Sequence, residues 1–149
     1  MFINSLKKIF NRDLEKLKME ICLYQNEKNI WITDKKISNS AGNLCLHLIG
    51  NLNTYIGAEI GKTSYVRNRD LEFSLKDTSK ARLIDKIDKT ILVVESSLNN
   101  ISEPQLQEEY PLNVLGEKTN YQFFLLHLAT HLNYHLGQVN YHRRLLDVN

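Results

Sequence analysis

Apolar side chains recur every three or four residues over four long stretches of this sequence, with charged and polar residues between them. On an α-helix this spacing gathers the apolar side chains on one face. The only two prolines, Pro104 and Pro111, both lie between the third and the fourth stretch, so no proline interrupts a stretch. The sequence therefore predicts four amphipathic helices and an all-α fold.

Capping residues and helix breaks indicate where each predicted helix begins and ends. The predicted helices are residues 2–24; a second helix capped within Ser38 to Ser40 and stopped at Gly61; a third capped by Asp77 or Thr78 and stopped in NNISEP (99–104); and a fourth capped by Thr119, from Asn120 to about Leu146.

The connections after the second and the third helix are long. KTSYVRNRDLEFSLK (62–76) is a charged connection that either crosses the molecule or carries function. YPLNVLGEKTN (110–120) is predicted to be extended, with a turn at Gly116. Because 149 residues suit one domain, we expect a single four-helix bundle over residues 1–149, with crossover connections.

Composition narrows the class of protein. No apolar run approaches the ~18–20 residues of a membrane span, and the N-terminal stretch lacks the apolar core of a signal peptide, so we expect a cytoplasmic protein without a membrane partner. The net charge of +2 is small and spread along the chain, which argues against nucleic-acid binding. The two cysteines, Cys22 and Cys45, are expected to be reduced and buried, and Cys45 is not expected to bind metal.

The stretch HLATHLNYHLGQVNYH, His127 to His142, holds four of the five histidines. At about 100° per residue, positions 127, 131, 135, 138 and 142 share one narrow helix face, beside the apolar residues that border the core. The opposite side, with Asn133, Asn140 and Arg144, is expected to face solvent. Arg143 and Arg144 complement the negative end of the helix dipole and need no substrate to explain them.

Clustered imidazoles repel one another when they are protonated, so the cluster favours neutral histidines or a bound cation. The alternative is a set of hydrogen-bonded packing residues. Two histidines at i and i+4 can reach one ion, and a third ligand must then come from another helix. His47 is the remaining histidine, on a face that also carries Asn51 and Tyr55 as polar partners. Three histidine ligands leave a coordination position open, as in catalytic metal sites.

The segments LLHLATHLNYHLGQVNYHRRLL (125–146) and NLCLHLIGNLNTYIGAEIG (43–61) resemble the last and the second helix of the DinB-like superfamily. RNRDLEF (67–73) is similar to the loop after the second helix in one bacterial branch of that superfamily. The resemblance implies a four-helix bundle with crossover connections, often dimeric, that holds one divalent ion such as nickel or zinc. By position, the resemblance implies the ligands His47, His131 and His135.

Around these ligands we expect polar neighbours. The resemblance implies that His127 usually stands outside the group of ligands and that Gln138 matches the position after the family's glycine. Arg67 and Arg69, together with Asp70 and Glu72, could close over the metal, orient an anionic substrate or form surface ion pairs.

The resemblance leaves the reaction open, because some relatives look like thiol-dependent transferases or isomerases and many have no established activity. A divalent ion on neutral imidazoles can hold a low-molecular-weight thiol as thiolate or lower the pKa of a bound water. No nucleophile elbow, phosphate loop or paired-carboxylate motif occurs in the sequence. We therefore expect a metal-dependent thiol transferase or isomerase; the alternatives are a metal-dependent hydrolase and a non-catalytic dimeric stress or scaffold protein.

Overall fold

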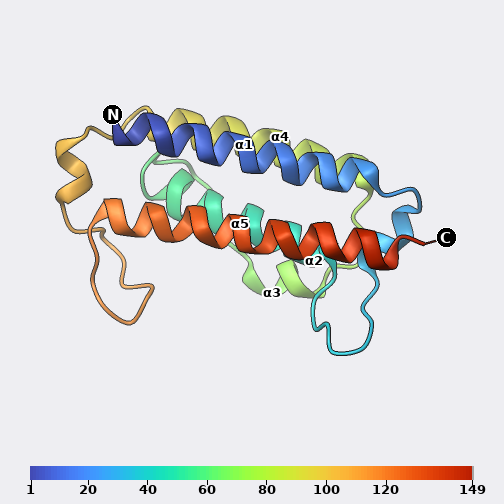
Figure 1. The fold of residues 1–149 in the computed structure, drawn as a ribbon. Coiled ribbons are helices and arrows are strands. Elements are labelled where there is room, and N and C mark those ends of the chain that lie inside the picture. The colour runs from blue at the N-terminus through green and yellow to red at the C-terminus, as the bar shows by residue number, and fades with distance from the viewer. Residues whose placement is uncertain (149) are drawn as a thin grey trace.

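The computed structural model describes residues 1–148, and these residues form helices and connections without a β-strand (Figure 1). The prediction of an all-helical protein is thus confirmed over the described residues. The α-helices are α1 (Phe2–Leu23), α2 (Ala41–Leu52), α3 (Arg69–Ser74), α4 (Lys80–Leu98) and α5 (Tyr121–Leu146). Shorter helical segments are η1 (Glu27–Trp31), η2 (Asn53–Ala58) and η3 (Pro104–Gln107).

The four long helices pack in two layers, with α1 and α4 in one layer and α2 and α5 in the other (Figure 1). α1 and α5 run in the same direction, whereas α2 and α4 run in the opposite direction. α2 contacts α3, α4, α5 and η1, and all twelve of its residues are buried. His47 therefore lies in a helix that is covered along its whole length.

The two long connections between helices take different paths over the molecule. Residues 59–79 return along the molecule, because α2 and α4 run in parallel, and this connection contains the short helix α3, which the sequence did not predict. Residues 99–120 stay at one end, where the Tyr110 hydroxyl donates to the Tyr55 carbonyl (2.7 Å) and the Ile3 N–H donates to Glu103 (3.2 Å). The second connection therefore departs from the predicted crossover, since α4 and α5 are antiparallel.

The caps of the long helices lie close to their predicted positions. Ser40 caps α2 by accepting from the Asn43 N–H, within the predicted range. The predictions for the other two helices were wrong by one or two residues: Ser79 caps α4 and Asn120 caps α5, each accepting from the backbone N–H three residues later. A neighbouring residue that can also cap makes this choice hard to read from sequence.

The second helix changes its geometry before it ends. The α-helical part of the predicted helix stops at Leu52, and η2 continues it as a π-helix, with the Gly61 N–H donating to the Ile56 carbonyl (2.9 Å). π-helical turns are rare and occur frequently at functional sites. η2 carries Tyr55, one of the residues predicted to lie near the site.

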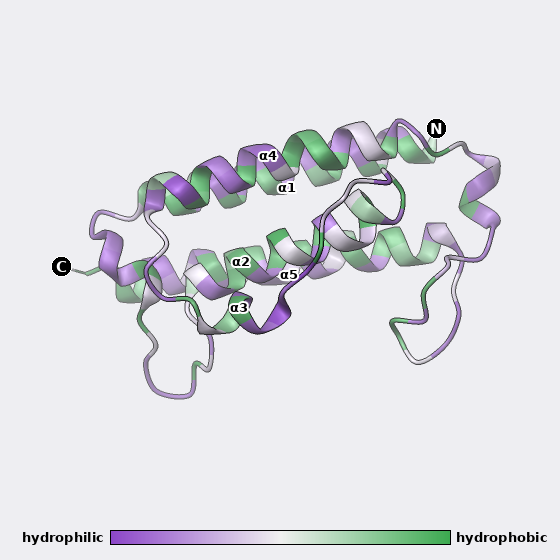
Figure 2. Cartoon of the chain, turned by 180° about the vertical axis from the view of Figure 1, so that it is seen from behind, coloured by the Kyte–Doolittle hydropathy of each residue, from purple (hydrophilic) through white to green (hydrophobic). Residues whose placement is uncertain are grey.

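The core is formed by the apolar faces of the long helices, and Figure 2 shows apolar and polar residues alternating along α1 and α4. Cys45 lies in this core, as predicted, and burial raises the pKa of its thiol to about 12. The prediction for Cys22 was wrong, because Cys22 is exposed near the end of α1. Within the described residues, no helix is both long enough and apolar enough to cross a membrane.

The predicted solvent side of α5 is partly an interface with α1. Asn133 and Arg144 are exposed as predicted, whereas Asn140 is half-buried. Asn133 donates to Asp13 (3.1 Å) and Asn140 donates to Glu20 (2.7 Å). The two amides are therefore used for packing α5 against α1, because a helix in this position touches neighbours on two sides.

Candidate metal centre

Three histidines meet where α2 and α5 cross. His131 and His135 lie one turn apart on α5, and His47 faces them from the middle of α2. His47 is buried, while His131 and His135 are half-buried. The two helices are antiparallel, so one turn of α2 lies opposite the two turns of α5 that carry the other histidines.

The ring nitrogens converge closely. Nε2 of His131 lies 3.2 Å from Nε2 of His47 and 3.1 Å from Nε2 of His135. One ligand atom from each of the three residues lies within 4.8 Å of the other two. Two nitrogens that share one Zn²⁺ ion at about 2.1 Å and a tetrahedral angle are about 3.4 Å apart. The spacing fits, and the three histidines could hold a metal ion.

In two of these histidines, a neighbouring oxygen determines which ring nitrogen carries the proton. His47 Nδ1 lies 3.1 Å from Glu72 Oε1, and His135 Nδ1 lies 2.6 Å from Gln138 Oε1. These oxygens accept hydrogen bonds, so Nδ1 carries the proton in both neutral imidazoles. The lone pairs on Nε2 of His47 and His135 therefore both point toward His131, in the arrangement that metal-binding histidines adopt.

Burial favours the neutral form of two of the three imidazoles, His131 and His47. Burial, together with the neighbouring His135 and His47, lowers the pKa of His131 to about 4. Burial also lowers the pKa of His47, although Glu72 acts in the opposite direction. Nδ1 of His131 is buried and has no hydrogen-bond partner. Lone pairs that face one another lack hydrogen-bond donors, so they cannot all be satisfied by the imidazoles themselves. Neutral imidazoles in this arrangement are suited to binding a cation.

Glu72 is the functional residue that the sequence analysis did not single out, beyond naming it among the charges of its loop. Its side chain is buried, and the Arg67 guanidinium donates hydrogen bonds to the carboxylate from Nε (2.8 Å) and Nη2 (2.9 Å). Asn43 holds the same short helix by donating to the Glu72 carbonyl (2.9 Å). A Cβ at position 50 would overlap the Glu72 carboxylate, so Gly50 provides the space for this contact with His47.

Helix α3 brings Glu72 to the site. The Asn68 side chain caps α3 by accepting from the Leu71 N–H (3.3 Å), which is a local signal readable in NRDLEF. Phe73, the next residue, packs against the His47 ring with the ring centres 5.1 Å apart. The capped turn could have been found from sequence, but its position over α2 depends on tertiary contacts.

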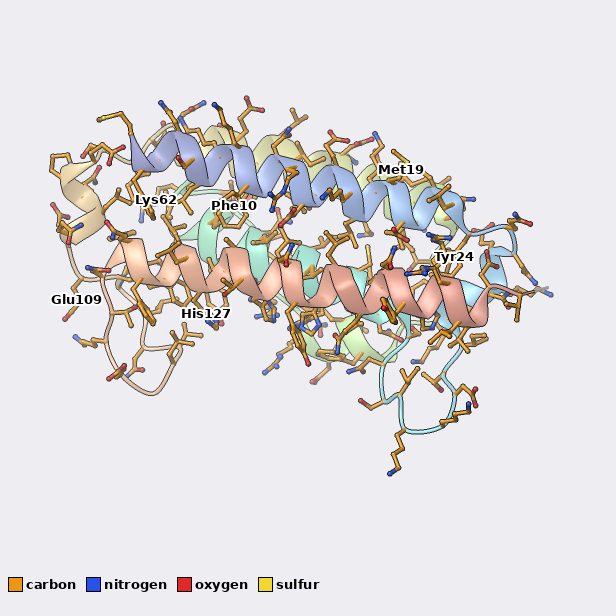
Figure 3. All side chains as sticks on the ribbon, in the orientation of Figure 1. Phe10, Met19, Tyr24, Lys62, Glu109 and His127 are labelled. Atoms are coloured by element: carbon orange, nitrogen blue, oxygen red, sulfur yellow. The ribbon has the colours of Figure 1, made fainter. Side chains whose placement is uncertain are left out.

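Two of the predicted neighbours, Gln138 and His127, contact histidines of the cluster. Gln138 contacts the ligand candidate His135, as described above. His127 lies on the side of α5 away from α1 (Figure 3) and stacks on His131, with the ring centres 6.1 Å apart. His127 also stacks on Phe124 and is outside the group of three converging nitrogens.

The other predicted neighbours differ in their relation to the cluster. Asn51 is buried, and its Oδ1 has no hydrogen-bond partner. Tyr55 packs edge-on against Phe124, and the Arg67 guanidinium lies over the Tyr55 ring at 5.8 Å. Arg67 also lies 3.4 Å from His47 Nδ1. Arg69 lies over the Phe73 ring at 5.9 Å, so it reaches the site only through Phe73.

The fold has been seen in another protein. The chain is similar to a solved structure described as the conserved protein of a locus from Enterococcus faecalis, with a TM-score of 0.76 and 16% sequence identity over 96% of this chain and 95% of that one. No curated protein matches the chain. The family described as "Protein of unknown function (DUF1572)" matches residues 1–149, and the chain therefore belongs to the DUF1572 family.

Proposed function

We propose that the protein is a single-domain, DinB-like four-helix bundle that binds one divalent metal ion, Ni²⁺ or Zn²⁺, on His47, His131 and His135. The proposal rests above all on the three converging Nε2 atoms. Glu72 and Gln138 support it by holding the protons of His47 and His135 on Nδ1. Such oxygen partners orient metal-binding histidines and tune their affinity in many proteins.

We propose further that the metal centre serves a thiol transferase or isomerase reaction. A bound divalent ion would supply the positive charge that holds a thiol as its reactive thiolate. The chain's own thiols do not suit this role: Cys45 is sealed in the core with a raised pKa, and Cys22 lies on α1. The nucleophile is then brought by a co-substrate, and the protein supplies orientation and a protected site.

Access to the histidines favours an enzyme over a scaffold protein. A cavity of about 450 Å³ is lined by His135 and Gln138, so a small molecule can approach the cluster from one side. A scaffold role would be served equally well by a sealed cluster. Hydrolysis with an activated water remains the alternative reaction, since the same cavity would admit it.

Elemental analysis of protein purified without a histidine tag tests the metal proposal. About one divalent ion per chain is expected, and zinc or nickel should restore that ratio after chelation and dialysis. A sample that binds less than about a tenth of an equivalent of every divalent metal offered would overturn the proposal.

The reaction is tested with metal-loaded protein, a halogenated aromatic or an epoxide, and several physiological thiols. Conjugation should be accelerated with one thiol, and a chelator should remove the acceleration. Cys45→Ser, repeated under the same conditions, should leave the rate unchanged because the thiol is external. If a metal-loaded sample accelerates no conjugation, hydrolysis or a scaffold role takes the place of the thiol reaction.

We also propose that the protein forms a homodimer through the α1 and α5 faces. Met19 and Tyr141 are exposed there, at 59% and 63%, and line a groove of about 550 Å³ with Leu136 and Gly137. Exposed apolar groups of this kind favour association with a second copy. Light scattering should give about twice the chain mass of 17.4 kDa, and a mass near 17.4 kDa at every concentration would contradict the proposal.

A further inference from the structure

The cavity beside His135 has a second wall that the proposed metal centre does not use. The loop of residues 32–40 faces the C-terminal half of α5 across it, and the space amounts to about 450 Å³. Lys36 and Ser38 line the loop side, while His135, Gln138, Tyr141 and Leu145 line the helix side. This volume lies within the range of small-molecule sites, and one of the three clustered histidines, His135, lines the space.

The loop wall is anchored at both ends. His142 Nε2 donates to the Ile32 carbonyl (2.8 Å), and the Tyr24 hydroxyl donates to His142 Nδ1 (2.6 Å). Tyr24 lies between the end of α1 and α5 (Figure 3), so two helices hold the start of the loop. At the other end, Ser40 caps α2. Lys36 is thus carried by a segment whose two ends are held in place.

In the part of the chain that the structure describes, the lining of the cavity carries a positive charge and no carboxylate. Lys36 is the one cationic side chain among the described residues that line it, and none of those residues is an aspartate or a glutamate. Ser38, Gln138 and Tyr141 add neutral hydrogen-bonding groups, and Leu145 adds an apolar surface. An ammonium group without a competing carboxylate attracts an anion, and a partly enclosed site strengthens this attraction.

We propose that this cavity binds a small thiol that carries a carboxylate, with the sulfur toward the histidine cluster and the carboxylate toward Lys36. The sulfur end of the ligand rests on the proposed metal function, whereas the carboxylate end rests on Lys36 and the absence of acidic groups in the lining. Lys36 would then determine which thiols are accepted, because a neutral or cationic thiol lacks the ion pair.

The test compares two probes of nearly equal size, 3-mercaptopropionate and its uncharged amide, on zinc-loaded protein. Binding is followed by amide chemical-shift changes in ¹⁵N-labelled protein. The carboxylate probe should bind about fivefold more tightly, the upper end of what one solvent-exposed ion pair supplies, and should shift amides of residues 36–39 and near Gln138. Lys36→Gln should make the two probes bind equally.

Lys35→Gln is the matched control, because Lys35 is the adjacent exposed lysine and does not line the cavity. This variant should keep the preference for the carboxylate. Equal binding of both probes by the unsubstituted protein, or a preference that survives Lys36→Gln, would overturn the inference.

Failure of the metal proposal is detected separately, by the elemental analysis. In that event propionate and propionamide are compared on the metal-free protein. A preference for propionate that disappears in Lys36→Gln would then support the carboxylate site without the metal, and the absence of such a preference would overturn the site as well.

Discussion

His131 and His142 lie on the same helix. His142 is buried and His131 is half-buried, and burial lowers the pKa of both. Their hydrogen bonding is opposite in kind. Both ring nitrogens of His142 have oxygen partners, the Tyr24 hydroxyl and the Ile32 carbonyl. His131 has one nitrogen without a partner and one that faces two other imidazole nitrogens.

The difference separates two kinds of histidine on one helix face. A neutral imidazole is satisfied by one donor and one acceptor, which is what His142 has, so it stabilises the packing of α1, α5 and the 32–40 loop. His131 meets two lone pairs at Nε2 and can offer a proton to only one of them at a time. A cation at that point would satisfy all three nitrogens, and this is the physical reason why we propose a binding role for His131 and a structural role for His142.

The largest effect is expected when His131 is removed. His131→Ala should lower metal affinity by more than about 100-fold, beyond the usual effect of losing a residue that only supports a ligand. The folding stability of the metal-free protein should change much less, because His131 is poorly satisfied without metal. Chelator competition measures the affinity, and chemical denaturation measures the stability.

The other histidines define the ligand set. His47→Ala and His135→Ala should resemble His131→Ala in chelator competition, whereas His127→Ala should weaken binding less, since His127 only stacks on His131. If His127→Ala were as damaging as His131→Ala while His47→Ala had no effect, the assignment of ligands would be wrong.

A substitution at Gly50 tests the support of His47 without touching a ligand. A Cβ at Gly50 would displace the Glu72 carboxylate, so Gly50→Ala should lower metal affinity by about 10–100-fold. Gly137→Ala on α5 is the control: a Cβ there meets no atom within 4 Å, and stability should rise by about 0.5–1 kcal/mol from helix propensity. Equal metal affinity in the two variants would exclude a supporting role for Glu72.

His142→Phe should have the reverse profile of His131→Ala. The buried Tyr24 hydroxyl loses its partner, which should reduce the free energy of unfolding by about 1–3 kcal/mol. Metal affinity should stay within about threefold, because His142 does not belong to the converging group. Urea denaturation measures the stability, and chelator competition on the same preparation measures the metal affinity. A clear loss of metal affinity in His142→Phe would contradict a purely structural role for His142.

The last expected effect is a pH dependence of the metal-free protein. The pKa of His131 is about 4 when folded and about 6.5 when unfolded, so between these values the unfolded chain binds more protons. The free energy of unfolding should therefore fall as the pH falls from about 7 to about 4. His47 and His142 shift in the same direction. Denaturation at pH 7.5 and 5.0 should show a smaller difference in His131→Gln; an unchanged difference would mean that His131 does not contribute.

Local spacing accounts for most of what the sequence predicted correctly. The three- and four-residue repeat located four helices, and the four-residue separation put His131 and His135 on neighbouring turns of one of them. Both results depend on helix geometry alone. Gln138 follows His135 by three residues, and its contact with that histidine is local in the same way.

Other features depended on residues far apart in the chain. Glu72 reaches His47 because α3 lies on α2, and no pattern in the 62–76 connection indicates that packing. The exposure of Cys22 and the contacts of Asn133 with α1 likewise follow from which helix neighbours which. The sequence by itself thus determined the helices and the shared face of the histidines, because these follow from the backbone repeat. Only the tertiary structure decided that His47 and Glu72 join His131 while His142 turns to Tyr24 and Ile32, because the packing of separate helices selects each partner.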